Sequence, residues 1–169
     1  MIVADATPLI HLARTRWLGV LPKLYRNVVV PPTVWREVLE PGARRVETHS
    51  LEEASQTWLE VRKVPAKARR ASAAYRRGVA LGAGEADAIA LAETLQVPLL
   101  MDDRVAVQFA RLRGLEPRWT TSVILEAQGM GILSATEART AVKDLVHAGL
   151  WIRQDVLLRI LDALGGRSD

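Results

Sequence analysis

The chain of 169 residues contains no cysteine, which excludes disulfide bonds and thiolate metal sites. It has no apolar run long enough to cross a bilayer, and no internal repeat or low-complexity linker. Its start, MIVADATPLIHLAR, places Asp5 where a signal peptide would have a cationic stretch leading into an apolar one. We therefore expect one compact unit without a membrane segment, located in the cytoplasm.

The composition permits a nucleic-acid partner without requiring one. Hydrophobic residues make up 49% and charged residues 25%, as in ordinary soluble proteins, and the net charge is +4 with a pI near 10.0. One segment carries five cations and no acid: Lys67, Arg69, Arg70, Arg76 and Arg77. Such a segment is either a solvated helix face or a surface that contacts phosphates.

Short apolar runs alternate with helical patterns along the chain. Strands are predicted at 1–4, 27–30, 58–64, 97–101 and 116–120. Helices are predicted at 9–24 (two, broken near Gly19 or Pro22), 33–39 (closed by Pro41-Gly42), about 51–57, within 65–96, at 104–113 and three times within 122–165. Thr7 is the expected N-cap of the first helix, with Pro8 at its first position. This alternation indicates an α/β fold with a parallel sheet.

Acidic residues stand where the buried strands end. Asp5 closes the first strand, and Asp102 and Asp103 close the strand at 97–101. Asp87 lies early in the helix that leads into that strand, and Glu37 lies in the helix after the second strand. Because ligands bind outside the carboxyl ends of parallel strands, we expect these carboxylates to surround one site.

Carboxylates without a histidine or cysteine beside them suit Mg²⁺ or Mn²⁺ better than Zn²⁺. Such an ion can activate water for attack on a phosphodiester. The hydroxyls of Thr7 and Thr120 could orient an acid or a metal-bound water. His11, His49 and His147 show no ligand spacing and are interpreted as structural.

Each acid also has a structural interpretation. Asp5 could end a strand, Asp103 could be a helix N-cap, Glu85 could cap its helix, and Asp87 could be favoured by the helix dipole. Glu37 could be a solvated helix acid, and only one of Asp102 and Asp103 needs to face the site. The five tryptophans are interpreted as packing residues, with Trp119 beside the expected site as the one of most interest.

Four acidic motifs in this order resemble the PIN-domain ribonucleases, above all the VapC-type toxins of toxin–antitoxin pairs. They are VADATPLI, VVVPPTVWREV, GEADAIALA and LLMDDRVAVQFA, and the resemblance runs from residue 1 to about 127. The tail after WTTSVILEAQGMGIL is similar to one subgroup with a short helical extension. The predicted division is therefore a PIN-like nuclease domain at 1–127 and a helical extension at 128–169, packed on that domain.

The resemblance implies a Rossmann-like three-layer fold, with a central parallel sheet of four to five strands flanked by helices. It implies Mg²⁺- or Mn²⁺-dependent cleavage of RNA that leaves 5′-phosphate and 3′-hydroxyl ends. The acidic cluster would be Asp5, Glu37, Asp87 and Asp103, with metal ligation by Asp5, Asp87 and Asp103. Supporting roles fall to Thr7, Thr120, Glu85 and Asp102, and the basic rim would be Arg69, Arg70, Arg76, Arg77 and Arg104. A homodimer and a small antitoxin that covers the site are also implied.

Three positions depart from the family pattern. Met101 stands where a threonine is usual, and Trp119 and Ser122 stand where the subgroup commonly has glycines. A haloacid-dehalogenase-type phosphatase is disfavoured because it needs a second aspartate two residues after the first, where this chain has Thr7. A non-catalytic PIN-like module that binds nucleic acid or protein, for example through helices at 136–164, remains the alternative.

Overall fold

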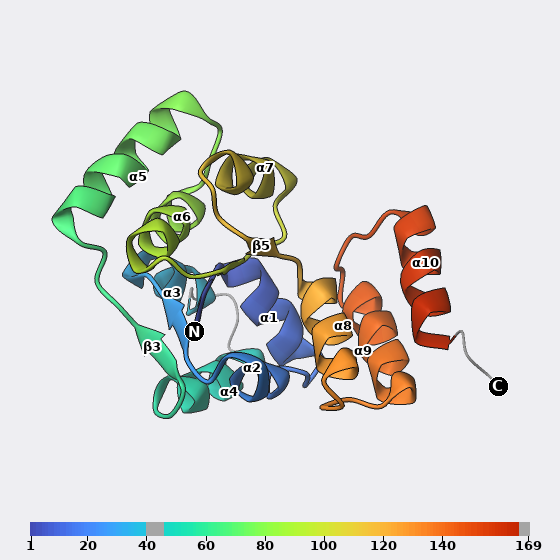
Figure 1. The fold of residues 1–169 in the computed structure, drawn as a ribbon. Helices are drawn as coiled ribbons and strands as arrows, with labels where there is room; N and C mark the ends of the chain where they lie inside the picture. Colours follow the sequence, from blue (N-terminus) through green and yellow to red (C-terminus); the bar gives the residue numbers. More distant parts are fainter. Residues whose placement is uncertain (40–45, 166–169) are drawn as a thin grey trace.

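The computed structural model describes residues 1–39 and 46–165 and contains a five-stranded parallel sheet (Figure 1). The strands are β1 (Ile2–Ala4), β2 (Val28–Val30), β3 (Leu59–Val61), β4 (Leu99–Leu100) and β5 (Pro117–Arg118), in the spatial order β3-β2-β1-β4-β5. All four neighbouring pairs are parallel. The predicted α/β fold with a parallel sheet of four to five strands is confirmed.

Helices connect every pair of consecutive strands. They are α1 (Ala6–Arg14), α2 (Val20–Tyr25), α3 (Pro32–Val38), α4 (Val46–Ser55), α5 (Ala66–Gly78), α6 (Ala83–Leu95), α7 (Arg104–Leu112), α8 (Thr120–Gly129), α9 (Ala135–His147) and α10 (Gln154–Gly165). Figure 1 shows α5, α6 and α7 on one side of the sheet and α2 and α4 on the other. This division follows from right-handed connections, since the chain moves one way from β1 to β3 and the other way from β3 to β5.

The strand order reverses at β1, which lies between β2 and β4. Val3 pairs with Val29 on one side and with Leu99 on the other, so the ends of β1 and β4 lie side by side. The residues that follow these two strands meet in the crevice where an open α/β sheet binds its ligand. Asp5 follows β1, and Asp102 comes two residues after β4.

The three central strands, β2, β1 and β4, are buried on both faces, which explains why they are continuous apolar runs. Ile2, Val3, Ala4 and Val28 to Val30 are fully buried, as are Leu99 and Leu100. Among the described residues, no helix combines the length and the apolar character needed to cross a membrane.

The last three helices pack one against the next, α8 on α9 and α9 on α10 (Figure 1). The Trp17 indole donates to Asp144 Oδ2 at 3.0 Å, and Arg14 Nη1 donates to the Ala148 carbonyl at 3.2 Å, so the C-terminal end of α9 is tied to the first part of the chain. The boundary predicted at residue 127 falls inside α8, and the division into two parts stays a prediction.

Several predicted boundaries differ from the structure. The N-cap of α1 is Asp5 rather than Thr7, because the helix begins directly after the strand and Thr7 lies in its first turn. The strand expected at 58–64 is only Leu59–Val61 at the sheet edge, and α4 begins at Val46 rather than near Leu51. Thr120 starts α8 instead of ending a strand. The helix end predicted at Pro41-Gly42 lies outside the described residues.

Candidate active site

Asp5 is a buried carboxylate with one oxygen that has no partner. Its backbone N–H continues the pairing of β1 with β4 by donating to the Leu100 carbonyl at 2.9 Å. Its side chain is 4% exposed, and Oδ1 has no hydrogen-bond partner among the described residues. Burial raises the pKa of Asp5 from 3.8 to about 7; the Ala6 N–H opposes this, and the nearby carboxylates Glu85, Glu37 and Asp102 add to it. A cation beside Oδ1 would relieve both the burial and the repulsion.

Asp102 is held by both polar groups of one threonine. Thr120, fully buried at the start of α8, donates its N–H to Asp102 Oδ1 at 2.9 Å and its hydroxyl to Oδ2 at 2.6 Å. Burial raises the pKa of Asp102, and the two bonds from Thr120 partly offset that rise. Thr120 therefore fixes the orientation of this carboxylate, which is the supporting contact predicted for its hydroxyl.

Glu37 reaches the site because position 84 has no side chain. The Gly84 N–H, in the first turn of α6, donates to Glu37 Oε1 at 3.2 Å. A Cβ at position 84 would lie 2.7 Å from each oxygen of Glu37, far inside van der Waals contact. The N-terminus of α6 thus holds the Glu37 carboxylate through a close backbone approach that only glycine permits.

Glu85 combines a capping contact with a place in the cluster. Its Oε2 accepts the Gly82 N–H at 2.7 Å, as the capping interpretation predicted. Burial raises its pKa; the Gly82 bond opposes this rise, and the charges of Asp103 and Glu37 add to it. Glu85 thus lies electrostatically among Asp5, Glu37 and Asp103.

Asp103 and Asp87 are engaged in other contacts. Asp103 is the exposed N-cap of α7, and its Oδ1 accepts the Ala106 N–H at 2.8 Å. Asp87 accepts the Thr33 hydroxyl at Oδ2 (2.8 Å) and the Ser72 hydroxyl at Oδ1 (2.6 Å), which joins α6 to α3 and α5. Residues two apart on an α-helix are rotated by about 200°, so Asp87 and Glu85 leave α6 on opposite sides.

The contacts therefore rank the acids differently from the sequence. The carboxylates that act on Asp5 are Glu85, Glu37 and Asp102, and Asp87 is not among them. The resemblance to the PIN-domain ribonucleases implied ligand roles for Asp5, Asp87 and Asp103 and supporting roles for Glu85 and Asp102. Those metal and catalytic roles stay predictions, as does the role of Thr7, which is exposed and whose hydroxyl forms no hydrogen bond within residues 1–39 and 46–165.

Two residues near the site had no predicted function. His11, on α1, is half-buried; burial lowers its pKa, and the charge of Asp102 opposes that shift, so the imidazole lies near this carboxylate. Gly84 has a visible signal in the sequence, because a glycine directly before an acid at a helix start is typical of a close backbone contact.

The carboxylates can hold a divalent cation through one or two protein ligands. Among the described residues, no three aspartate, glutamate or histidine side chains are close enough to form a ready-made metal site. Mg²⁺ commonly binds through one or two carboxylates and keeps several waters, so three protein ligands are not required. The unpartnered, buried Oδ1 of Asp5 is the atom that fits such an ion best.

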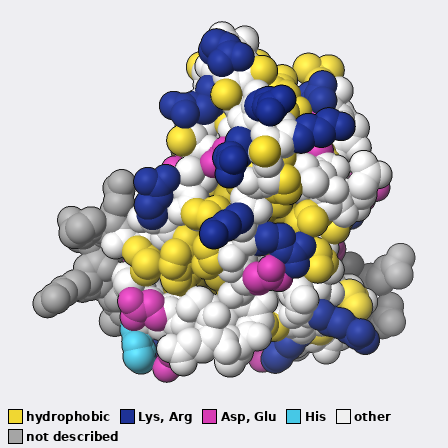
Figure 2. Space-filling view, turned by 90° about the vertical axis from the view of Figure 1, so that its left-hand side faces the viewer, with side chains coloured by type: hydrophobic (Ala, Val, Ile, Leu, Met, Phe, Trp, Pro, Cys, Tyr) yellow, Lys and Arg dark blue, Asp and Glu magenta, His cyan; other side chains and the backbone are white. Residues whose placement is uncertain are grey.

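The basic rim lies mainly on α5. Arg69, Arg70, Arg76 and Arg77 are exposed on this helix, which contains no acid, and Lys67 is exposed beside them. Figure 2 shows Lys and Arg side chains spread over the upper part of this face of the molecule. Arg104, also exposed, stands apart at the start of α7, directly after the acidic pair.

The comparisons agree with this architecture. The crystal structure of VapBC2 from Rickettsia felis, bound to a DNA fragment from their promoter, contains a chain that superposes with a TM-score of 0.53 at 16% identity. The match covers 70% of this chain and 98% of that one, and at this identity it shows the fold alone. No curated protein matches the chain. A family model described as PIN domain matches residues 1–166, and the chain therefore belongs to the PIN-domain family.

Proposed function

We propose that the protein is a metal-dependent endoribonuclease with its site at the ends of β1 and β4. The observation that carries the proposal is Asp5, buried among Glu37, Glu85 and Asp102, with an unpartnered oxygen and a pKa raised to about 7. A purely structural carboxylate would be satisfied by donors, as Asp87 is. Perturbed carboxylates gathered in the crevice of an α/β sheet are typical of catalytic sites.

We assign metal binding to Asp5 and Asp102, supported by Glu37 and Glu85. Mg²⁺ or Mn²⁺, when bound, supplies a Lewis acid that activates water and neutralises charge on the phosphodiester. Thr120 keeps Asp102 oriented, and Gly84 keeps Glu37 against α6. Glu85 Oε1, the oxygen that Gly82 does not hold, is suited to take up a proton, because burial raises the pKa of this carboxyl.

RNA is the proposed substrate because a phosphate backbone would complement the cationic α5. Single-stranded or structured RNA offers such a backbone without requiring a sequence-reading groove. A small antitoxin is a further proposed partner, supported by the likeness in fold to a chain of the R. felis complex. A homodimer and a cytoplasmic location stay predictions.

The direct test is incubation of the purified protein with a mixed RNA pool in Mn²⁺, Mg²⁺ or a chelator. We expect cuts in either metal, none in chelator, and new ends that carry a 5′-phosphate and a 3′-hydroxyl. An Asp5→Asn variant with unchanged circular dichroism controls for a contaminating nuclease. Cutting that persists in chelator, or in the variant, would contradict the proposal. Binding of RNA without cutting in either metal would favour the non-catalytic alternative.

Replacement of Gly84 by alanine is expected to reduce cleavage by about tenfold or more with little change in stability. The new Cβ would displace the Glu37 carboxylate, and losing a contact that orients a metal-site acid typically costs 10- to 100-fold. The displaced atoms are the end of a flexible side chain, and alanine favours a helix over glycine by about 1 kcal/mol. Cleavage rates and urea unfolding measure the two effects.

Gly78→Ala is the matched control, because a Cβ there meets no atom within 4 Å. It should leave cleavage at the wild-type rate. Equal cleavage by Gly84→Ala and Gly78→Ala would show that the position of Glu37 against α6 is not needed.

A further inference from the structure

A cavity of about 390 Å³ lies beside Asp102, between α7, the start of α8 and the segment that joins α9 to α10. Small-molecule sites span roughly 300–1,000 Å³, so this cavity can hold a group the size of a nucleobase. Asp102 is part of its wall, and so are Leu150, Ile152 and Val156. The start of α10 and the segment before it thus contribute to a cavity that also adjoins the acidic cluster.

Two indoles line this cavity. Trp119 directly precedes Thr120, whose N–H and hydroxyl both bind Asp102, so Trp119 and the acid are positioned by the same contact. Trp151 is 81% exposed. This is unusual, because tryptophan has the largest apolar side chain and the other long apolar residues of this protein are mostly buried. Trp119, by contrast, is partly buried and packs against the core. Aromatic side chains that line a cavity beside a phosphate-processing site are suited to stack on unpaired bases.

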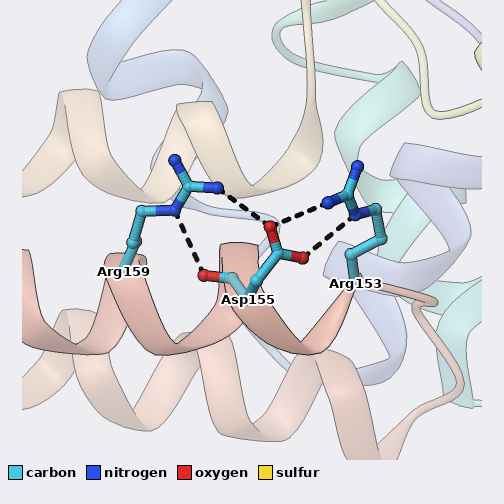
Figure 3. Close-up of polar contacts among 3 residues, drawn as sticks. All are labelled: Arg153, Asp155 and Arg159. Carbon is cyan, nitrogen blue, oxygen red and sulfur yellow. Dashed lines mark hydrogen bonds and ion pairs between the residues drawn. The ribbon is translucent and has the colours of Figure 1, made fainter.

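The edge of the cavity is cationic. Arg104 and Arg111 contribute to the lining and form no ion pair with any residue of the described ranges. Arg153 also contributes, and it binds Asp155 through Nε at 3.0 Å and through Nη2 at 2.8 Å (Figure 3). Arg159 shares the same carboxylate at 2.9 Å, so two guanidinium groups face one acid and the net charge there is positive.

We propose that this cavity binds one base of a single-stranded RNA whose phosphate lies at the acidic cluster. The base would stack on Trp119 or Trp151, and the arginines would neutralise the phosphates on either side. Gln108 and Thr121, also in the lining, are polar groups able to hydrogen-bond the edge of a base. The inference rests on the proposed function, and it makes the C-terminal helices determinants of where the RNA is cut.

The test measures base binding without catalysis. Protein labelled with ¹⁵N-tryptophan gives five indole signals, one for each tryptophan, and single substitutions assign them. In chelator, the titrants are tetraribonucleotides of adenine, cytosine or uracil and an abasic ribose phosphate tetramer. We expect the Trp119 and Trp151 signals to shift with at least one tetranucleotide and to stay unchanged with the abasic tetramer, which carries the same phosphates.

Substitutions at Trp151 separate stacking from general packing. Trp151→Ala should weaken tetranucleotide binding by roughly tenfold, and Trp151→Tyr should restore most of it, because tyrosine also stacks. Leu112→Ala, which removes an apolar side chain that is 85% exposed but lies outside the cavity, should bind as the wild type does. In cleavage assays, Trp151→Ala should flatten the base preference next to the cut.

Three results of the binding test would overturn the inference. They are equal shifts with the abasic tetramer, shifts confined to the other three tryptophans, and movement of the Trp151 signal with protein concentration alone, which would make this face a contact between copies. Base binding without any RNA cleavage would refute the proposed function but leave the cavity assignment intact. Cleavage with an unchanged base preference in Trp151→Ala would support the proposed function and overturn the cavity assignment.

Discussion

Asp102→Asn is expected to reduce metal-dependent RNA cleavage by at least about 100-fold, because it removes a carboxylate assigned to the cation. Loss of a residue that merely supports a metal ligand costs 10- to 100-fold, and loss of a ligand should cost no less. Asparagine can still accept the Thr120 N–H, so the fold around α8 should persist. Cleavage rates in saturating Mn²⁺, with metal binding followed by calorimetry, measure the effect.

Asp87→Asn is the matched comparison, on an acid that the sequence ranked above Asp102. Its carboxylate serves the Thr33 and Ser72 hydroxyls, and an amide can hydrogen-bond both, because hydroxyls accept as well as donate. We expect metal affinity within about twofold of wild type and a loss of about 1 kcal/mol in the free energy of unfolding. If Asp87→Asn abolished metal binding and Asp102→Asn did not, the assignment from the contacts would be wrong and the original ranking right.

The sequence indicates that several acids lie at one edge of the sheet more clearly than it distinguishes among these acids. Asp5 was predictable as a candidate site residue, because few structural roles require an acid directly after a buried strand. Parallel strands place their ends at one edge, and that rule brings Asp5 and the 102–103 pair together. The order of the strands, with β1 between β2 and β4, then decides which ends are neighbours.

The ranking from the sequence and the contacts in the structure differ where two acids stand one or two residues apart. Glu85 and Asp87 share Ala86 as a neighbour and have only glycine or alanine on their other sides, so the apolar pattern of α6 does not distinguish the side facing β1 from the side facing α3 and α5. Asp102 and Asp103 are adjacent in the sequence. They differ in the structure because Asp103 is the N-cap of α7. Long-range contacts distinguish the acids in both cases, through Thr33 and Ser72 for Asp87 and through Thr120 for Asp102.

The cavity beside Asp102 had only a partial signal. Trp119 was of interest from its position alone, but Trp151 and Arg153 are more than thirty residues further along the chain, in a segment where apolar residues indicated packing. Packing of α10 on α9 brings this segment close to the site. Hydrophobic periodicity within one helix does not predict which distant segment of the chain packs beside it.

Without metal, the protein is expected to lose stability as the pH rises, and Asp5→Asn should reduce that loss. The Asp5 carboxyl has a pKa of 3.8 when unperturbed and about 7 in the folded protein. Between these values the folded chain keeps a proton that the unfolded chain has released, so the free energy of unfolding falls with rising pH and levels off above about 7. Each pH unit in that window contributes about 1.4 kcal/mol, which gives a difference of about 3 kcal/mol between pH 5 and pH 8.

Urea unfolding in chelator at pH 5 and pH 8 measures this difference for the wild type and for Asp5→Asn. The variant cannot ionise at position 5 and also removes one repulsive charge from Glu85 and Asp102, whose pKa values are raised as well. Its stability should therefore fall less between the two pH values. Mn²⁺ at pH 8 should restore stability to the wild type, because a ligand bound only by the folded state stabilises it, and should restore little to the variant. Parallel pH dependence in the two proteins, with equal responses to Mn²⁺, would mean that Asp5 is neither strained by its burial nor a ligand of the cation.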